Sequence, residues 1–91
     1  MSREDTDEET GRLSSLAIGV RLRDARNARG LTCAELAHLA GISHGSVSFI
    51  ETGKNQPRTD TVERLARALK VPRAWLAFGD GRKPDFAKGR E

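Results

Sequence analysis

The segment that decides the fold runs from Thr32 to Lys54 and reads TCAELAHLAGISHGSVSFIETGK. Its first residues form a capping box, because the Thr32 hydroxyl can accept the N–H of Glu35 while the Glu35 carboxylate reaches back to the backbone of Thr32. The apolar residues that follow predict a helix over residues 33–40. The segment therefore opens with a helix whose start is fixed locally.

A tight turn follows this helix. Gly41 ends the helix because glycine accepts a positive φ. Only Ile42 separates Gly41 from Ser43. Ser43 is a good N-cap, so a second helix is predicted over residues 43–52. Ala37 is small enough to let the second helix approach where the two helices cross. The turn therefore holds the second helix out as a rod of the shape that enters a DNA major groove about 12 Å wide.

Three further helices and no strand are predicted around this pair. The preceding helix is expected over residues 16–28, with Ser14 or Ser15 as its N-cap. The helix after the pair has one apolar face, made by Val62, Leu65, Ala66 and Leu69. Asp60 and Glu63 are expected to cap its start, and Pro72 to open a short last helix that Gly79 ends. The fold class is therefore all-α with five helices.

Length and charge limit what such a chain can do. Its 91 residues amount to one domain. Residues 1–14 carry five acidic and two basic side chains, whereas residues 15–79 carry ten basic and five acidic ones. A basic body favours polyanionic partners, nucleic acid first, although an ordinary solvated surface is the alternative. The single cysteine and the lack of a long apolar run indicate a cytoplasmic protein without a membrane partner.

The charge pattern also divides the chain. We expect residues 1–13 to be a disordered acidic N-terminal arm, residues 14–79 to be the folded domain, and residues 80–91 to be a flexible basic C-terminal tail. Phe86 is the only large apolar residue of that tail.

The segment from Ile18 to Gly79 resembles the DNA-binding domain of phage repressor and Cro-type (XRE-like) helix-turn-helix regulators. Its hallmark residues are Glu35-Leu36-Ala37, Ala40-Gly41-Ile42-Ser43, Val47-Ser48 and Ile50-Glu51-Thr52-Gly53-Lys54. The resemblance implies a compact, lambda-repressor-like domain. It also implies a sequence-specific regulator of transcription that binds double-stranded DNA, most simply a repressor that occupies a near-palindromic operator as a homodimer.

By this resemblance, the third helix reads bases through its exposed residues Ser43, His44, Gly45, Ser46, Ser48 and Phe49. His44 can donate to a guanine acceptor, and Phe49 can pack on thymine methyls. The alternatives are a solvated His44 and a core Phe49. Gly45 lets the backbone approach DNA closely, so DNA shape is expected to supplement a modest direct readout.

Phosphate contacts are expected on both sides of that helix, from Thr32, Cys33, Lys54, Asn55, Gln56 and Arg58. Relatives commonly carry glutamine at the position of Cys33, so here only the backbone N–H at the helix N-terminus remains for a phosphate. The other arginines, at positions 21, 23, 29, 64, 67 and 73, are expected to be surface charges.

The resemblance also implies a buried ion pair between Arg26 and Glu51, the alternative being two exposed charges. The dimer contact is expected from the last helix, through Trp75, Leu76 and Phe78, with Trp75 as a plain core residue as the alternative.

Other functions find little support. Cys33, His38 and His44 fit no four-ligand zinc site, no phosphate-binding glycine loop occurs, and no catalytic triad can be drawn. We therefore expect no metal, no cofactor and no enzyme activity. The remaining alternative is an antitoxin or protein-interaction module that holds a protein partner through the two tails, and Cys33 as a redox switch is a minor one.

Overall fold

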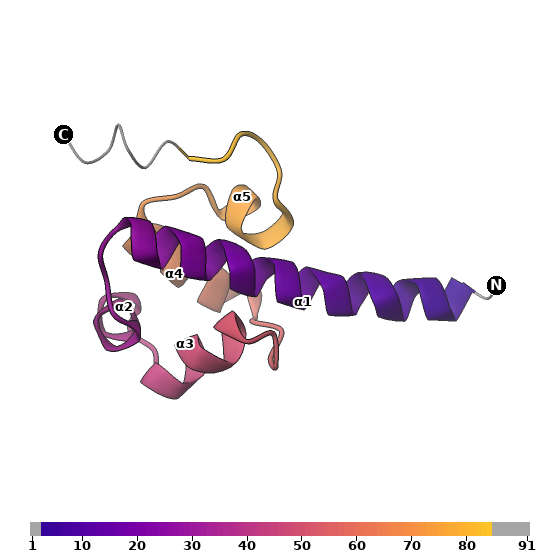
Figure 1. Ribbon diagram of the computed structural model, residues 1–91, viewed down its shortest axis with the longest axis horizontal. Coiled ribbons are helices and arrows are strands. Elements are labelled where there is room, and N and C mark those ends of the chain that lie inside the picture. Colours follow the sequence, from indigo (N-terminus) through magenta and orange to yellow (C-terminus); the bar gives the residue numbers. More distant parts are fainter. Residues whose placement is uncertain (1–2, 85–91) are drawn as a thin grey trace.

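The structure, a computed structural model, describes the backbone of residues 3–84 and the side chains of residues 15–84. This part of the chain contains five α-helices and no strand (Figure 1). They are α1 (Arg3–Ala28), α2 (Cys33–Ala40), α3 (His44–Glu51), α4 (Thr59–Leu69) and α5 (Arg73–Phe78). The predicted all-α, five-helix fold is confirmed.

The start of α1 differs from the prediction. The helix begins at Arg3, so the expected N-cap at Ser14 or Ser15 is wrong, and residues 3–13 are helical rather than disordered. Acidic side chains are favourable in the first turns of a helix, and extending an existing helix is much easier than nucleating a new one. Residues 1 and 2 lie outside the described residues.

The helix-turn-helix pair forms as its caps predict. Thr32 and Glu35 make both hydrogen bonds of the capping box at the start of α2. Gly41 ends α2 in the left-handed conformation, with φ 72°. Ser43 caps α3 by accepting the N–H of Ser46. These contacts span at most four residues, which is why the sequence alone specifies them.

The caps of the last two helices differ from the prediction. Arg58 occupies the N-cap of α4 and makes no side-chain capping bond, so the expected cap by Asp60 and Glu63 is wrong. Glu63 pairs with Arg73 instead. Pro72 occupies the N-cap of α5 rather than its first turn.

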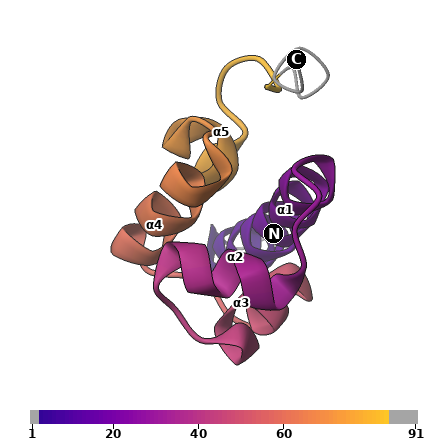
Figure 2. The ribbon, with the colours of Figure 1, turned by 90° about the vertical axis from the view of Figure 1, so that its left-hand side faces the viewer.

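The core lies where the five helices meet. α1 packs on α3 and α5, and α2 packs on α3 and α4 (Figure 2). The largest fully buried side chains are Leu22, Leu36, Val47, Leu65, Leu69 and Leu76. Within residues 3–84 no helix is long and apolar enough to cross a membrane.

Candidate nucleic-acid interface

The outer face of α3 is open to solvent. Ser43, His44, Gly45, Ser48 and Phe49 are exposed, and Ser46 is half-buried. On the inner side of the same helix Val47 and Ile50 are buried in the core. The structure therefore brings all six predicted base-reading residues to the accessible side of α3.

The exposure of Phe49 decides whether this residue belongs to the core. Its side chain is 48% exposed, so it is not a core residue. The exposed aromatic ring of Phe49 and the exposed imidazole of His44 give α3 one apolar contact group and one hydrogen-bonding group. Ser43 and Ser46 add hydroxyls, but these two groups lie 2.8 Å apart and bond to each other. A ligand must therefore compete with that internal bond.

The N-terminus of α2 lies beside α3 in the helix-turn-helix pair. The Thr32 N–H donates to Glu35 Oε1 at 2.8 Å, and the Thr32 hydroxyl accepts the N–H of Glu35 at 3.0 Å. The bond from the Thr32 N–H lowers the pKa of Glu35 from its ordinary value, because it favours the ionised carboxylate. Both polar groups of Thr32 therefore already serve the cap.

The loop between α3 and α4 supplies exposed cations next to α3. Lys54, Asn55, Gln56 and Arg58 are all exposed. The Lys54 N–H donates to Phe49 O at 3.0 Å, which fixes the start of the loop against α3. Among the described residues neither Lys54 nor Arg58 forms an ion pair. Their charges remain available to an anion next to α3.

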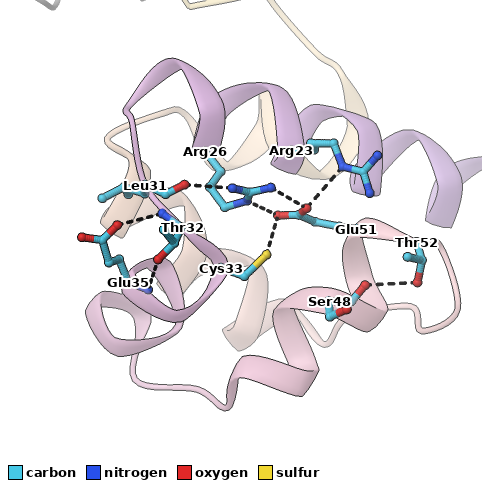
Figure 3. Close-up of polar contacts among 9 residues, drawn as sticks. All are labelled: Arg23, Arg26, Leu31, Thr32, Cys33, Glu35, Ser48, Glu51 and Thr52. Atoms are coloured by element: carbon cyan, nitrogen blue, oxygen red, sulfur yellow. Dashed lines mark hydrogen bonds and ion pairs between the residues drawn. The ribbon is translucent and has the colours of Figure 1, made fainter.

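A buried ion pair fixes the end of α3 to α1, as predicted (Figure 3). Arg26 Nε lies 2.6 Å from Glu51 Oε2, and Arg26 Nη2 donates to Glu51 Oε1 at 3.1 Å. The Glu51 side chain is only 3% exposed. Arg26 also donates to Leu31 O at 2.8 Å, which ties the α1–α2 turn to the pair. The hydrogen bond to Glu51 raises the pKa of Arg26.

Two further side chains join this carboxylate. Arg23 Nε lies 3.3 Å from Glu51 Oε1, although the Arg23 side chain is 54% exposed and was expected to be a surface charge. Cys33 Sγ lies 3.9 Å from Glu51 Oε2. The Cys33 thiol therefore points inward (Figure 3), and any phosphate contact at this position falls to the backbone.

Two other arginines are structural, which sequence patterns did not reveal. Arg21 donates to the carbonyls of Leu76 and Ala77 at the end of α5, and burial lowers the pKa of Arg21. Arg29 donates to Leu69 O at 2.8 Å at the end of α4. Cations satisfy unpaired carbonyls and the negative end of the dipole at a helix C-terminus. Part of the positive charge of the body thus holds the fold together.

The predicted dimer residues separate into two groups. Trp75 and Leu76 are buried in the core of the chain itself, so their expected role at a dimer surface is wrong. Phe78, in contrast, is 77% exposed. It borders a groove of about 500 Å³ whose apolar lining includes Ile18, Pro57 and Ala77. Phe86 of the tail lies outside the described residues.

A family of helix-turn-helix domains matches residues 17–77 of this chain. The HTH-type transcriptional regulator RghRB of Bacillus subtilis is 47% identical over 56 residues, covering 60% of this chain and 40% of that protein. The transcriptional repressor RghR of the same organism is 39% identical over 66 residues, covering 71% and 49%. The chain thus matches less than half the length of either relative.

Solved structures agree in fold. The restriction-modification controller protein C.AhdI of Aeromonas hydrophila superposes with a TM-score of 0.66 at 32% identity, covering 68% of this chain and 94% of that one. The clp gene regulator ClgR of Corynebacterium glutamicum superposes with a TM-score of 0.67 at 26% identity, covering 85% and 80%.

Proposed function

The chain belongs to the XRE-like helix-turn-helix family of DNA-binding transcription regulators, and from this we propose that it is a repressor that binds a near-palindromic operator as a homodimer. One observation carries the proposal. The exposed face of α3 is held out by the buried Arg26–Glu51 pair and is flanked by Lys54 and Arg58, which form no ion pair within residues 15–84. A rod of this kind with cations beside it suits a major groove and its phosphates.

We assign the base contacts to the outer face of α3. His44 donates to a guanine acceptor, and Phe49 packs against thymine methyls. Ser43, Ser46 and Ser48 bond several base edges, while Gly45 brings the backbone close to the DNA. Because α3 offers no arginine, glutamine or asparagine for a two-pronged base contact, sequence-dependent DNA shape supplies the rest of the specificity.

We assign the phosphate contacts to the two flanks of α3. Lys54, Asn55, Gln56 and Arg58 hold one strand from the α3–α4 loop. The N–H of Cys33 faces the other strand, and Thr32 joins it where a phosphate displaces one of its capping bonds. Phe78 is the exposed apolar anchor of the homodimer, since it is accessible beside an apolar groove. A DNA partner in turn implies a cytoplasmic location, and no enzymatic step is needed for repression.

The relatives support this role by name. RghR is named a transcriptional repressor, and C.AhdI is named a controller protein of a restriction-modification system.

Selection of bound duplexes from a random pool tests the proposal. The full chain is compared with a Lys54→Ala/Arg58→Ala variant and with a Lys70→Ala/Arg82→Ala control that loses the same charge at exposed positions outside the loop. We expect wild type and control to enrich one palindrome with half-sites about 34 Å apart, and the loop variant to enrich none. Failure of wild type to enrich any sequence at low salt would make the helix pair a scaffold for a protein partner of the tails.

A further inference from the structure

A second charged surface lies between α2 and α4, outside the interface proposed above. It is a groove of about 540 Å³ lined by Leu39, Ala40, Arg64, Arg67 and Ala68. None of these residues belongs to the exposed face of α3 or to the α3–α4 loop. The groove combines two guanidinium groups with a smaller apolar surface.

The two arginines of the groove are exposed, and the described part of the chain offers them no acidic partner. Arg64 Nη1 makes one long hydrogen bond, 3.4 Å, to Gly41 O. Glu63 lies four residues before Arg67 on α4, where it would be a natural partner, but it pairs with Arg73. Across residues 15–84 no carboxylate forms an ion pair with Arg64 or Arg67. The groove therefore favours an acidic occupant.

This chain carries an acidic helical segment at its N-terminal end. Residues 1–14 hold five acidic and two basic side chains, and α1 begins at Arg3. At about 1.5 Å per residue, residues 3–14 add about 18 Å of helix before the first described side chain. Figure 1 shows this part of α1 projecting from the body at the end opposite α2. As a helix it does not reach the groove of the same molecule.

We propose that the groove between α2 and α4 receives the acidic N-terminal part of α1 from a second copy of this chain. The two surfaces differ, so the contact is head-to-tail, and a bound pair still has one free groove and one free acidic segment for further copies. Such a contact builds open rows instead of closed pairs. If the chain binds operators as proposed, such rows would make the occupancy of neighbouring operators cooperative. This consequence rests on the proposed function.

DNA phosphates are the other anion that the arginines would attract. The apolar part of the groove favours the helix, because Leu39, Ala40 and Ala68 offer contact surface that a phosphate backbone does not use. A protein segment can bury such surface along with its carboxylates, whereas phosphate contacts are made by charge and hydrogen bonding.

Analytical ultracentrifugation of the full chain without DNA tests the proposal. All proteins carry Phe78→Ser, which removes the α5 contact of the proposed homodimer. At about 0.01 M salt, where the Debye length is about 30 Å, the mean mass should rise steadily with protein concentration. At about 1 M salt, where that length is about 3 Å, the rise should disappear.

Two variants with charged side chains neutralised identify the two surfaces that associate. Arg64→Gln/Arg67→Gln removes the charge of the groove, and Glu4→Gln/Glu8→Gln/Glu9→Gln brings the net charge of residues 1–14 to zero. Each variant alone should lose the association. An equal mixture should form pairs and nothing larger, because each variant contributes one intact surface. A Lys70→Gln/Arg82→Gln control, with the same charge change as the groove variant, should associate like the parent protein.

Three results would overturn the proposal: no salt-dependent association, association that persists in the groove variant, or a mixture that does not pair. On a duplex with a single binding site, the groove variant should bind as tightly as the Lys70→Gln/Arg82→Gln control. Weaker binding would make the groove a phosphate contact instead. Self-association is measured without DNA, so it can be observed even if the duplex selection enriches no sequence. The proposal of self-association and the proposal of DNA binding are therefore tested independently.

Discussion

Glu51 links the end of α3 to α1 and to the start of α2. Its carboxylate, at the end of α3, meets Arg26 and Arg23 of α1 and the thiol of Cys33 at the start of α2. Since Arg26 also holds Leu31 O, one carboxylate fixes α3, the α1–α2 turn and α2 together. The orientation of the exposed α3 face therefore depends on a residue that does not itself face solvent.

We predict that Glu51→Gln lowers the free energy of unfolding by about 3–5 kcal/mol, because it leaves the largely buried Arg26 without a counter-charge. Arg23→Gln removes only the exposed partner of the same carboxylate and should cost less than about 1 kcal/mol. Urea unfolding followed by circular dichroism measures both. Equal losses in the two variants would contradict the assignment of the Arg26–Glu51 pair as the central contact.

At the scale of elements, the helices are held together by close backbone approach and by caps. A Cβ placed on Gly19 of α1 would lie 2.5 Å from Ile50 O and 2.7 Å from Glu51 O at the end of α3. Arg21 of α1 and Arg29, directly after the end of α1, donate to carbonyls at the ends of α5 and α4. α1 thus contacts α3 and α5 directly, and Arg26 of α1 holds the turn before α2 through Leu31 O.

We predict that Gly19→Ala destabilises the fold by about 1–3 kcal/mol, because backbone atoms of α3 must move to admit the methyl group. Gly45→Ala is the matched control. Its Cβ would meet nothing within 4 Å, so helix propensity should raise stability by up to about 1 kcal/mol. Thermal unfolding of both variants checks the opposite signs. A Gly19→Ala protein as stable as wild type would show that α1 and α3 do not approach this closely.

The capping box of α2 should make stability depend on pH. The Thr32 bonds lower the pKa of Glu35 from its ordinary 4.5, so the folded state favours the carboxylate. Its contribution is complete above pH 4.5 and is lost as the pH falls through the lower folded value. We expect the stability difference between wild type and Glu35→Ala to be greatest near neutral pH and to shrink below pH 4.5.

Thr32→Ala is the control for this titration, since it removes the hydroxyl partner and so reduces the pH dependence itself. Urea unfolding of the three proteins between about pH 3 and pH 7, around the ordinary pKa, supplies the comparison. A difference between wild type and Glu35→Ala that stays constant across this range would count against the ionised cap.

At the scale of the whole molecule, positive charge is divided between structure and surface. Arg21, Arg26 and Arg29 are engaged with carbonyls or with Glu51, whereas Lys54 and Arg58 stay exposed beside α3. The net charge therefore overestimates the number of positive side chains that can contact a DNA phosphate. The salt dependence of binding measures the available part.

We predict that the affinity for an enriched operator falls linearly with salt on logarithmic axes, with a slope of about −0.9 per phosphate neutralised. Lys54→Ala/Arg58→Ala should make this slope about two units shallower. Fluorescence anisotropy at several salt concentrations gives both slopes, with Lys70→Ala/Arg82→Ala as the control for charge alone. An unchanged slope in the loop variant would remove these two residues from the phosphate contacts.

Local contacts are what the sequence by itself determined. The capping box, the Gly41 turn, the Ser43 cap and the apolar face of α4 are fixed within a few residues, so short windows of sequence contain their causes. The Arg26–Glu51 pair came from the family resemblance. The N-terminal turns of α1 could not be predicted from the sequence, because they carry no apolar periodicity. They are helical because a helix that is already packed extends easily.

The tertiary structure alone decided the partners of several long side chains and which apolar residues of α5 are covered. Arg21 and Arg29 reach carbonyls 40 to 56 residues away, and Cys33 turns toward Glu51 instead of outward. On α5 it buried Trp75 and Leu76 and left Phe78 exposed. These outcomes depend on where other helices cross, and no short window of sequence contains that information.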